Sequence, residues 1–168
     1  VFEPEVILMD EPLGALDKKL RQQTQLELVN MLEQVGVTCI MVTHDQEEAM
    51  TMATRVAIMS DGKLRQVGTP REIYDYPNSR FTAEFIGETN LISGTVIEDA
   101  PDSCVIGSKE LVNPIRLGHG ITGPADQDVW VSLRPEDVNL SRSKPTNDFN
   151  WEEGKVKEIA YLGSFAFY

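Results

Sequence analysis

The chain has 168 residues, of which 41% are hydrophobic, 25% are charged and 7% are aromatic, an ordinary composition for a globular protein. Its net charge of −12 disfavours nucleic acid as a partner, because the 15 basic residues are scattered along the sequence. No apolar run approaches the ~20 residues of a membrane-spanning helix. The two cysteines, Cys39 and Cys104, exclude a disulfide framework and fit a reducing compartment.

The first half of the chain begins with a strand–helix–strand pattern. Val6–Met9 and Thr38–Thr43 are short apolar runs, typical of strands covered on both faces. Parallel strands joined by a helix cross over right-handed, so their carboxyl ends share one edge of the sheet, where ligands bind. We therefore expect Asp10 and Glu11, which follow the first strand, to lie near His44, which follows the second.

A helix is predicted over Lys18–Val35, between these strands. Asp17 is suited to be its N-cap, and Gly36 stands where a helix-terminating glycine belongs. The predicted buried face is apolar and follows the i, i+3, i+4, i+7 spacing: Leu28, Met31, Leu32 and Val35.

Shorter elements are predicted after His44. Asp45 and Glu48 form a capping-box-like start for a helix that ends near Ala53. A hairpin with its turn at Asp61–Gly62 follows. Two short helical pieces come next, around Thr69–Tyr74 and Ser79–Ile86.

The pattern changes after Gly87 to short alternating runs separated by turn residues, which indicates an all-β region. We therefore divide the chain into residues 1–87 and residues 88–168. The predicted strands of the second part are Ile92–Glu98, Ser103–Ile106, Val129–Leu133, Asp137–Leu140 and Lys155–Tyr161.

Four residues are candidates for chemistry, and each also has a structural interpretation. Asp10 can hold Mg²⁺ through its water shell, and Glu11 can deprotonate a water, but acidic pairs after strands are often only solvated. His44 can be structural, and Asp17 can be only a helix cap. A metal-dependent hydrolase using Asp10, Glu11 and His44 is disfavoured, because the one other histidine, His119, has no ligand cluster around it.

Several segments resemble, in order and spacing, parts of the ATPases of ABC transporters. Val6–Asp17 is similar to the Walker B strand and D-loop, and Cys39–Ala49 to the switch-histidine segment. Asp61–Gly62 and Gly68–Tyr74 resemble the turn and following helix of the importer branch. Phe81–Gly87 and Thr89–Leu91 resemble the passage into that branch's regulatory domain, and Ser132–Val138 resembles the domain's Arg-Pro-Glu stretch. Within the branch the chain looks most like polyamine importers, nearer to the putrescine type.

The resemblance implies an α/β fold: the C-terminal half of a P-loop ABC ATPase domain in residues 1–87, then a truncated, OB-like (TOBE-type) all-β regulatory domain in residues 88–168. It implies that Glu11 is the general base and that His44 contacts the γ-phosphate. Asp10 would hold Mg²⁺ through water, and Asp17 would act across a dimer interface. Positioning and electrostatics of this kind account for most catalysis of phosphoryl transfer.

The resemblance also implies a system around the chain. The cofactors would be ATP and Mg²⁺, and the partners a second ATPase subunit, transmembrane permease subunits and a separate substrate-binding protein. Hydrolysis would drive import of putrescine or spermidine from the cytoplasmic face of the inner membrane, where the subunit would be peripheral.

Parts of the family pattern are missing from the sequence. The phosphate-binding motif G-x-x-x-x-G-K-[ST], the signature loop and the glutamine loop do not occur in it. We therefore expect a fragment of a longer ATPase subunit that is inactive alone. The alternative is a stand-alone regulatory or interaction module that binds no nucleotide.

Overall fold

The computed structural model describes residues 4–121, 123–146, 150–161, 163 and 166–168. The chain forms two compact units, of which the first ends at Glu88 and the second begins at Thr89. Helices and small sheets make up the first unit, and the second is built mainly of strands, so the fold is mixed α/β. No helix among the described residues is long and apolar enough to cross a membrane.

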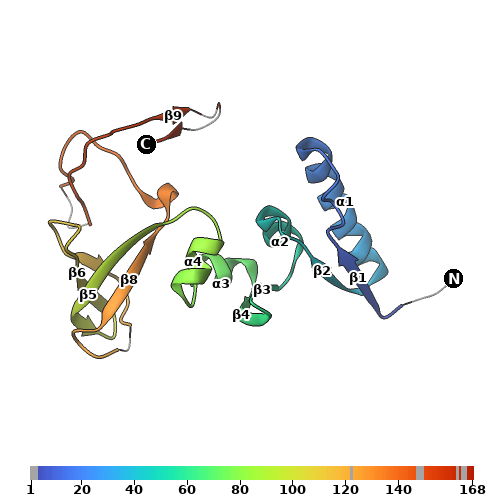
Figure 1. The fold of residues 1–168 in the computed structure, drawn as a ribbon, viewed down its shortest axis with the longest axis horizontal. Helices are drawn as coiled ribbons and strands as arrows, with labels where there is room; N and C mark the ends of the chain where they lie inside the picture. Colours follow the sequence, from blue (N-terminus) through green and yellow to red (C-terminus); the bar gives the residue numbers. More distant parts are fainter. Residues whose placement is uncertain (1–3, 122, 147–149, 162, 164–165) are drawn as a thin grey trace. The chain divides into compact units, whose positions relative to one another are not determined.

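A parallel strand pair opens the first unit. β1 (Val6–Asp10) pairs with β2 (Thr38–Val42), and α1 (Lys18–Val35) connects them (Figure 1). Asp10 lies opposite Val42, and the backbone N–H of Glu11 extends the pairing by donating to the Val42 carbonyl at 2.8 Å. The predicted strand–helix–strand arrangement is confirmed.

Both predicted ends of α1 are confirmed. The Asp17 Oδ1 accepts hydrogen bonds from the backbone N–H groups of Lys19 and Leu20, each at 3.1 Å. Gly36 has a φ of 68° and donates its N–H to the Leu32 carbonyl. This left-handed conformation favours glycine, so the helix ends where the sequence places one.

The prediction that both strands are covered on both faces is wrong. Exposure alternates along β1 and β2, and Leu8, Ile40 and Val42 are 75%, 56% and 59% exposed. The intervening side chains are half-buried, because a single crossover helix covers only one face of a strand pair. The apolar runs do not distinguish these two faces.

The predicted face of α1 is also partly wrong. Met31 is 53% exposed and Val35 is 74% exposed, whereas Gln25 is 3% exposed. Buried and half-buried positions follow the line from Arg21 through Gln25 to Leu32. Polar side chains therefore share the covered face, and a pattern of apolar residues alone misplaces it.

The rest of the first unit surrounds a small apolar core. Its elements are α2 (Gln46–Met52), β3 (Val56–Ser60), β4 (Lys63–Gly68), α3 (Pro70–Asp75) and α4 (Arg80–Phe85). The core consists of Val56, Ile58, Ile73 and Ile86. Asp61 and Gly62 have φ values of 52° and 69°, as a type I′ turn requires, so the predicted hairpin is confirmed. The two predicted short helices are confirmed as α3 and α4.

An antiparallel sheet with the order β7-β6-β5-β8 dominates the second unit. Its strands are β5 (Asn90–Ala100), β6 (Ser103–Gly107), β7 (Ile115–Leu117) and β8 (Asp128–Leu133). Val96, Cys104, Ile106 and Ile115 form its buried core. The sequence patterns predicted β5, β6 and β8 but not β7, which is too short to show an alternation.

One strand predicted in the second unit is wrong, and another is confirmed only at its C-terminal end. A 3₁₀ turn, η1 (Pro135–Asp137), ends at the first residue of the predicted strand Asp137–Leu140, and residues 138–140 are not in a strand. A proline at the first position followed by two acids favours the start of a helical turn. Of residues 155–161, only Ala160–Tyr161 form a strand, β9, which pairs with β10 (Ala166–Phe167).

Gly94 tests the packing of the second unit. An added Cβ would lie 2.5 Å from Ile106 Cγ2 and 2.8 Å from the Gly107 carbonyl oxygen. We expect Gly94→Ala to lower the free energy of unfolding of this unit by about 1–3 kcal/mol, since overpacking forces side chains and backbone to shift. Denaturant unfolding followed by fluorescence of Trp130 and Trp151 measures this. Gly118→Ala is the control, because among the described residues no atom beyond its chain neighbours lies within 4 Å of its added Cβ. An equal effect of both variants would contradict the prediction.

Candidate active site

The carboxyl edge of the β1–β2 pair brings together two side chains that are 33 residues apart in the sequence. His44 Nδ1 lies 2.9 Å from Glu11 Oε1, within hydrogen-bond distance. The parallel register explains this meeting, because Glu11 follows the last residue of β1 and His44 lies just beyond the end of β2. The pair is open to solvent, with side chains 52% and 75% exposed.

Electrostatics favour a protonated His44. The hydrogen bond to the Glu11 carboxylate and its negative charge raise the pKa of His44 above the ordinary 6.5, and Asp45 and Glu48 add to the effect. With Nδ1 donating to Glu11, the other ring nitrogen is left for a ligand. The arrangement can therefore place the Glu11 carboxylate, which can accept a proton, beside the His44 imidazole, which can donate a hydrogen bond to an anion.

Glu11 has an unusual backbone. Its φ of 45° lies in the left-handed region, which is uncommon for residues other than glycine. Its carbonyl accepts the N–H of Gly14 at 3.2 Å, which closes a turn over the buried Leu13. The turn ends at Leu16, immediately before Asp17, so a short segment joins the Glu11 carboxylate to the start of α1.

Asp10 and Asp17 are placed differently from this pair. Asp10 is exposed at the end of β1, and its carboxylate is the hard oxygen ligand that hydrated Mg²⁺ prefers. No group of three or more His, Cys, Asp or Glu side chains that could hold a metal ion occurs in the described part of the chain. Asp17 is also exposed, and its Oδ1 is engaged as the N-cap of α1.

A polar network behind His44 was not predicted. Thr43 Oγ1 donates to Glu48 Oε2 at 2.6 Å and accepts the N–H of Asp45 at 3.0 Å. Asp45 caps α2 as expected, but the reciprocal arm of the predicted capping box is wrong: Thr43, not Glu48, satisfies the N–H of Asp45. Glu48 is instead 1% exposed and turned toward Arg21 of α1.

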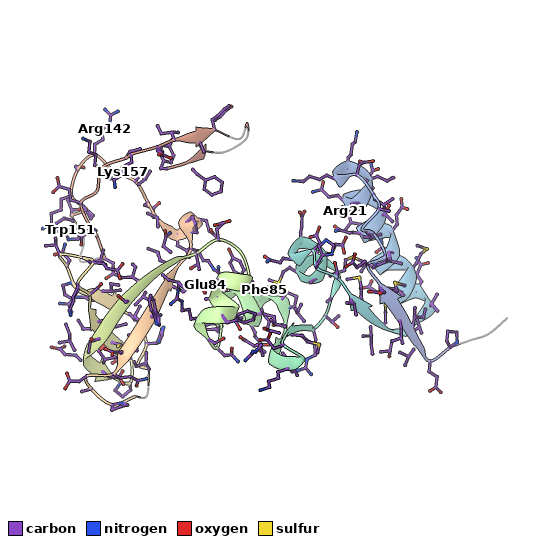
Figure 2. The ribbon with its side chains drawn as sticks, in the orientation of Figure 1. Arg21, Glu84, Phe85, Arg142, Trp151 and Lys157 are labelled. Carbon is purple, nitrogen blue, oxygen red and sulfur yellow. The ribbon has the colours of Figure 1, made fainter. Side chains whose placement is uncertain are left out.

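Arg21 joins this network and was also not predicted from the sequence. It donates from Nη1 to Asp45 Oδ2 at 2.6 Å and from Nη2 to the Leu16 carbonyl at 3.0 Å. Figure 2 shows its side chain between α1 and α2. The signal in the sequence was weak, because a single arginine on a helix is usually a solvated charge.

Curated proteins similar to this chain share one kind of name. The putrescine transport ATP-binding protein PotG of Escherichia coli (strain K12) is 50% identical over 165 residues, which are 98% of this chain and 44% of that protein. The spermidine/putrescine import ATP-binding protein PotA of Trichodesmium erythraeum is 43% identical over 173 residues, covering 100% of this chain and 45% of that protein. PotA of Chromobacterium violaceum is 38% identical over 176 residues, covering 100% of this chain and 46% of that protein.

The similarity extends over the whole chain, but the chain spans less than half the length of each of these relatives. No protein-family model matches the chain. The homologues are thus polyamine import ATP-binding proteins, as the sequence resemblance predicts, and the comparison applies to a part of each of them.

The Glu11–His44 contact is open to direct measurement. We expect Glu11→Gln to lower the pKa of His44 toward its ordinary value, since the amide removes the negative charge that stabilises the imidazolium. An NMR titration of the imidazole protons measures this, with His119 of the second unit as the internal control. An unchanged His44 pKa would contradict the contact.

The same shift sets the sign of a pH effect. Because the folded-state pKa of His44 is raised, its contribution to stability is fully present below about pH 6.5 and is lost as the pH rises through the folded-state pKa. The Glu11→Gln variant should lack this dependence.

Proposed function

We propose that this chain is part of the ATP-binding subunit of a polyamine importer and carries the water-activating half of its hydrolytic site. The observation that carries the proposal is the Glu11–His44 pair at the shared carboxyl edge of two parallel strands. Similarity to putrescine and spermidine/putrescine import proteins over the whole chain supports the transported class.

In this proposal Glu11 is the general base. Its carboxylate takes the proton from a water whose oxygen forms a bond to the γ-phosphorus, while the bond from the γ-phosphorus to the bridging oxygen breaks and releases ADP and phosphate. His44 holds the Glu11 carboxylate through Nδ1 and offers its other ring nitrogen to the γ-phosphate. The raised pKa of His44 favours the positively charged form, which opposes the charge of the phosphate.

Asp10 and Asp17 have supporting roles in the proposal. Asp10 would hold Mg²⁺ through water, and the bound ion supplies positive charge that offsets the charge of the phosphates. Asp17 would act across the interface with a second ATPase subunit, while its Oδ1 continues to cap α1. These two uses are compatible, because a carboxylate has two oxygens with several lone pairs.

The proposal extends to the organisation of the protein. Residues 1–87 would belong to the ABC ATPase domain and residues 88–168 to an OB-like, TOBE-type regulatory domain. The antiparallel sheet of the second unit supports the latter assignment. The working assembly would pair two ATPase subunits with transmembrane permease subunits at the cytoplasmic face of the inner membrane, and a separate binding protein would deliver the polyamine.

The function is tested in the complete subunit assembled with its permease. We expect Glu11→Gln to preserve ATP binding while lowering both ATP hydrolysis and uptake of labelled putrescine by about 10²–10⁴-fold, the usual cost of losing a general base. His44→Ala should likewise lower turnover and leave nucleotide affinity largely intact.

Glu33→Gln provides the matched control, since Glu33 is an exposed residue of α1 away from the carboxyl edge. A Glu11→Gln subunit that hydrolyses ATP at a near wild-type rate would remove Glu11 from its role. Hydrolysis by the wild-type assembly without uptake of putrescine or spermidine would leave the ATPase intact and overturn the transported class.

The isolated chain should behave differently from the complete subunit. Because its sequence has no phosphate-binding loop, we expect it to hydrolyse no ATP and to bind ATP–Mg²⁺ no tighter than about 1 mM, or about −4 kcal/mol. Isothermal titration calorimetry of the 168-residue chain measures this affinity. Micromolar binding would show that the chain contains a nucleotide site of its own.

A further inference from the structure

Arg21 connects the two segments that carry the proposed hydrolytic residues. Its Nη1 donates to Asp45 Oδ2 at 2.6 Å, and its Nη2 donates to the Leu16 carbonyl at 3.0 Å. Its Nε lies 3.8 Å from Glu48 Oε1, which is an ion-pair distance beyond hydrogen-bond range. A single guanidinium therefore spans the turn after β1 and the start of α2.

The contacts of Arg21 surround His44 in the sequence. Asp45 follows His44 and binds the guanidinium directly. Thr43 precedes His44 and is held through Glu48, to which its hydroxyl donates at 2.6 Å. Both neighbours of His44 are thus linked to Arg21 of α1, Asp45 by a hydrogen bond and Thr43 through Glu48.

The second nitrogen of the guanidinium, Nη2, binds the turn that follows β1. Leu16 is the last residue of the segment that starts at Glu11, and the next residue is Asp17. When Nη2 holds the Leu16 carbonyl, the separation between this turn and the N-cap of α2 is set by the rigid spacing of two nitrogen atoms in one plane.

The side chains that Arg21 connects are largely shielded from solvent. The Glu48 side chain is 2% exposed, and the Arg21 and Asp45 side chains are 27% and 24% exposed. A buried carboxylate requires a nearby opposite charge, which the guanidinium supplies. Arg21 Nε is itself buried without a hydrogen bond in the described part of the chain, so it faces Glu48 with an unused donor.

We propose that Arg21 is a positioning residue of the hydrolytic site, holding His44 and the Glu11–Leu16 turn at a fixed separation through Asp45 and Leu16. The inference rests on the proposed function, because it gives Arg21 a task in that reaction. It predicts that the geometry of the fork matters in addition to the charge. Lysine keeps the positive charge near Glu48, but its one ammonium group cannot reach both Asp45 and the Leu16 carbonyl.

The test compares Arg21→Lys with the wild type in the complete subunit assembled with its permease. We expect kcat for ATP hydrolysis to fall about 10- to 100-fold with little change in KM, since a displacement of about 1 Å can cost this much in rate. Asp45→Asn keeps an N-cap side chain but removes the charge, so it should cause a similar fall. The double variant should be little worse than either single variant, because both break one connection.

Arg71→Lys is the matched control. Arg71 makes an exposed ion pair with Asp75 within α3, so the same substitution there should leave both kcat and KM unchanged. A kcat for Arg21→Lys within about twofold of the wild type, in an assembly that hydrolyses ATP, would overturn the positioning role and leave the proposed function standing. Equal kcat losses in Arg21→Lys and Arg71→Lys would also overturn it.

A second readout separates the two proposals if the wild-type assembly itself fails to hydrolyse ATP. In the 168-residue chain at fixed pH, Arg21→Lys should shift the imidazole NMR resonances of His44 and leave those of His119 in place. Unmoved His44 resonances would contradict the positioning role independently of any activity. Denaturant unfolding of the same variant reports whether the first unit remains folded.

Discussion

The candidate site depends on the parallel pairing of β1 with β2. The register places Asp10 opposite Val42, and the Glu11 N–H then bonds to the Val42 carbonyl. A shift of one residue would turn every side chain of a strand to the other face and separate Glu11 from His44. Because α1 joins the strands by a crossover, both carboxyl ends open on the same edge. The meeting of Glu11 with His44 therefore depends on the backbone hydrogen bonds of this strand pair.

Helix capping ties this edge to the rest of the first unit. Asp17 and Asp45 are each the N-cap of a helix, and each stands beside a residue of the proposed chemistry or takes part in it. Such caps contribute about 0.5–2 kcal/mol to helix stability. Arg21 then links the two capped ends to each other. Stability and site geometry thus come from the same few carboxylates, which makes a purely structural interpretation and a functional one compatible.

Local rules accounted for most of the elements. The cap at Asp17, the glycine at Gly36 and the turn at Asp61–Gly62 each rest on a conformational preference of the residue itself, and each was predictable from the sequence. The meeting of Glu11 and His44 followed from strand topology, although the roles proposed for them came from the family resemblance.

What escaped prediction depends on packing. The covered face of α1 includes Gln25 and Arg21, which no apolar pattern identifies, and the Arg21–Asp45 contact joins residues 24 positions apart. The exposed face of β1 and β2 was not predictable either, since an apolar run does not show whether one or both faces of a strand are covered.

The left-handed backbone of Glu11 sets stability against chemistry at one position. A φ of 45° at a residue with a Cβ costs roughly 1–3 kcal/mol, and glycine would relieve most of it. A search for more thermostable variants would therefore favour glycine at this position and discard the carboxylate that meets His44. Under the role proposed for Glu11, sequences selected for activity would retain this glutamate and tolerate the strain, whereas sequences selected only for folding would lose it.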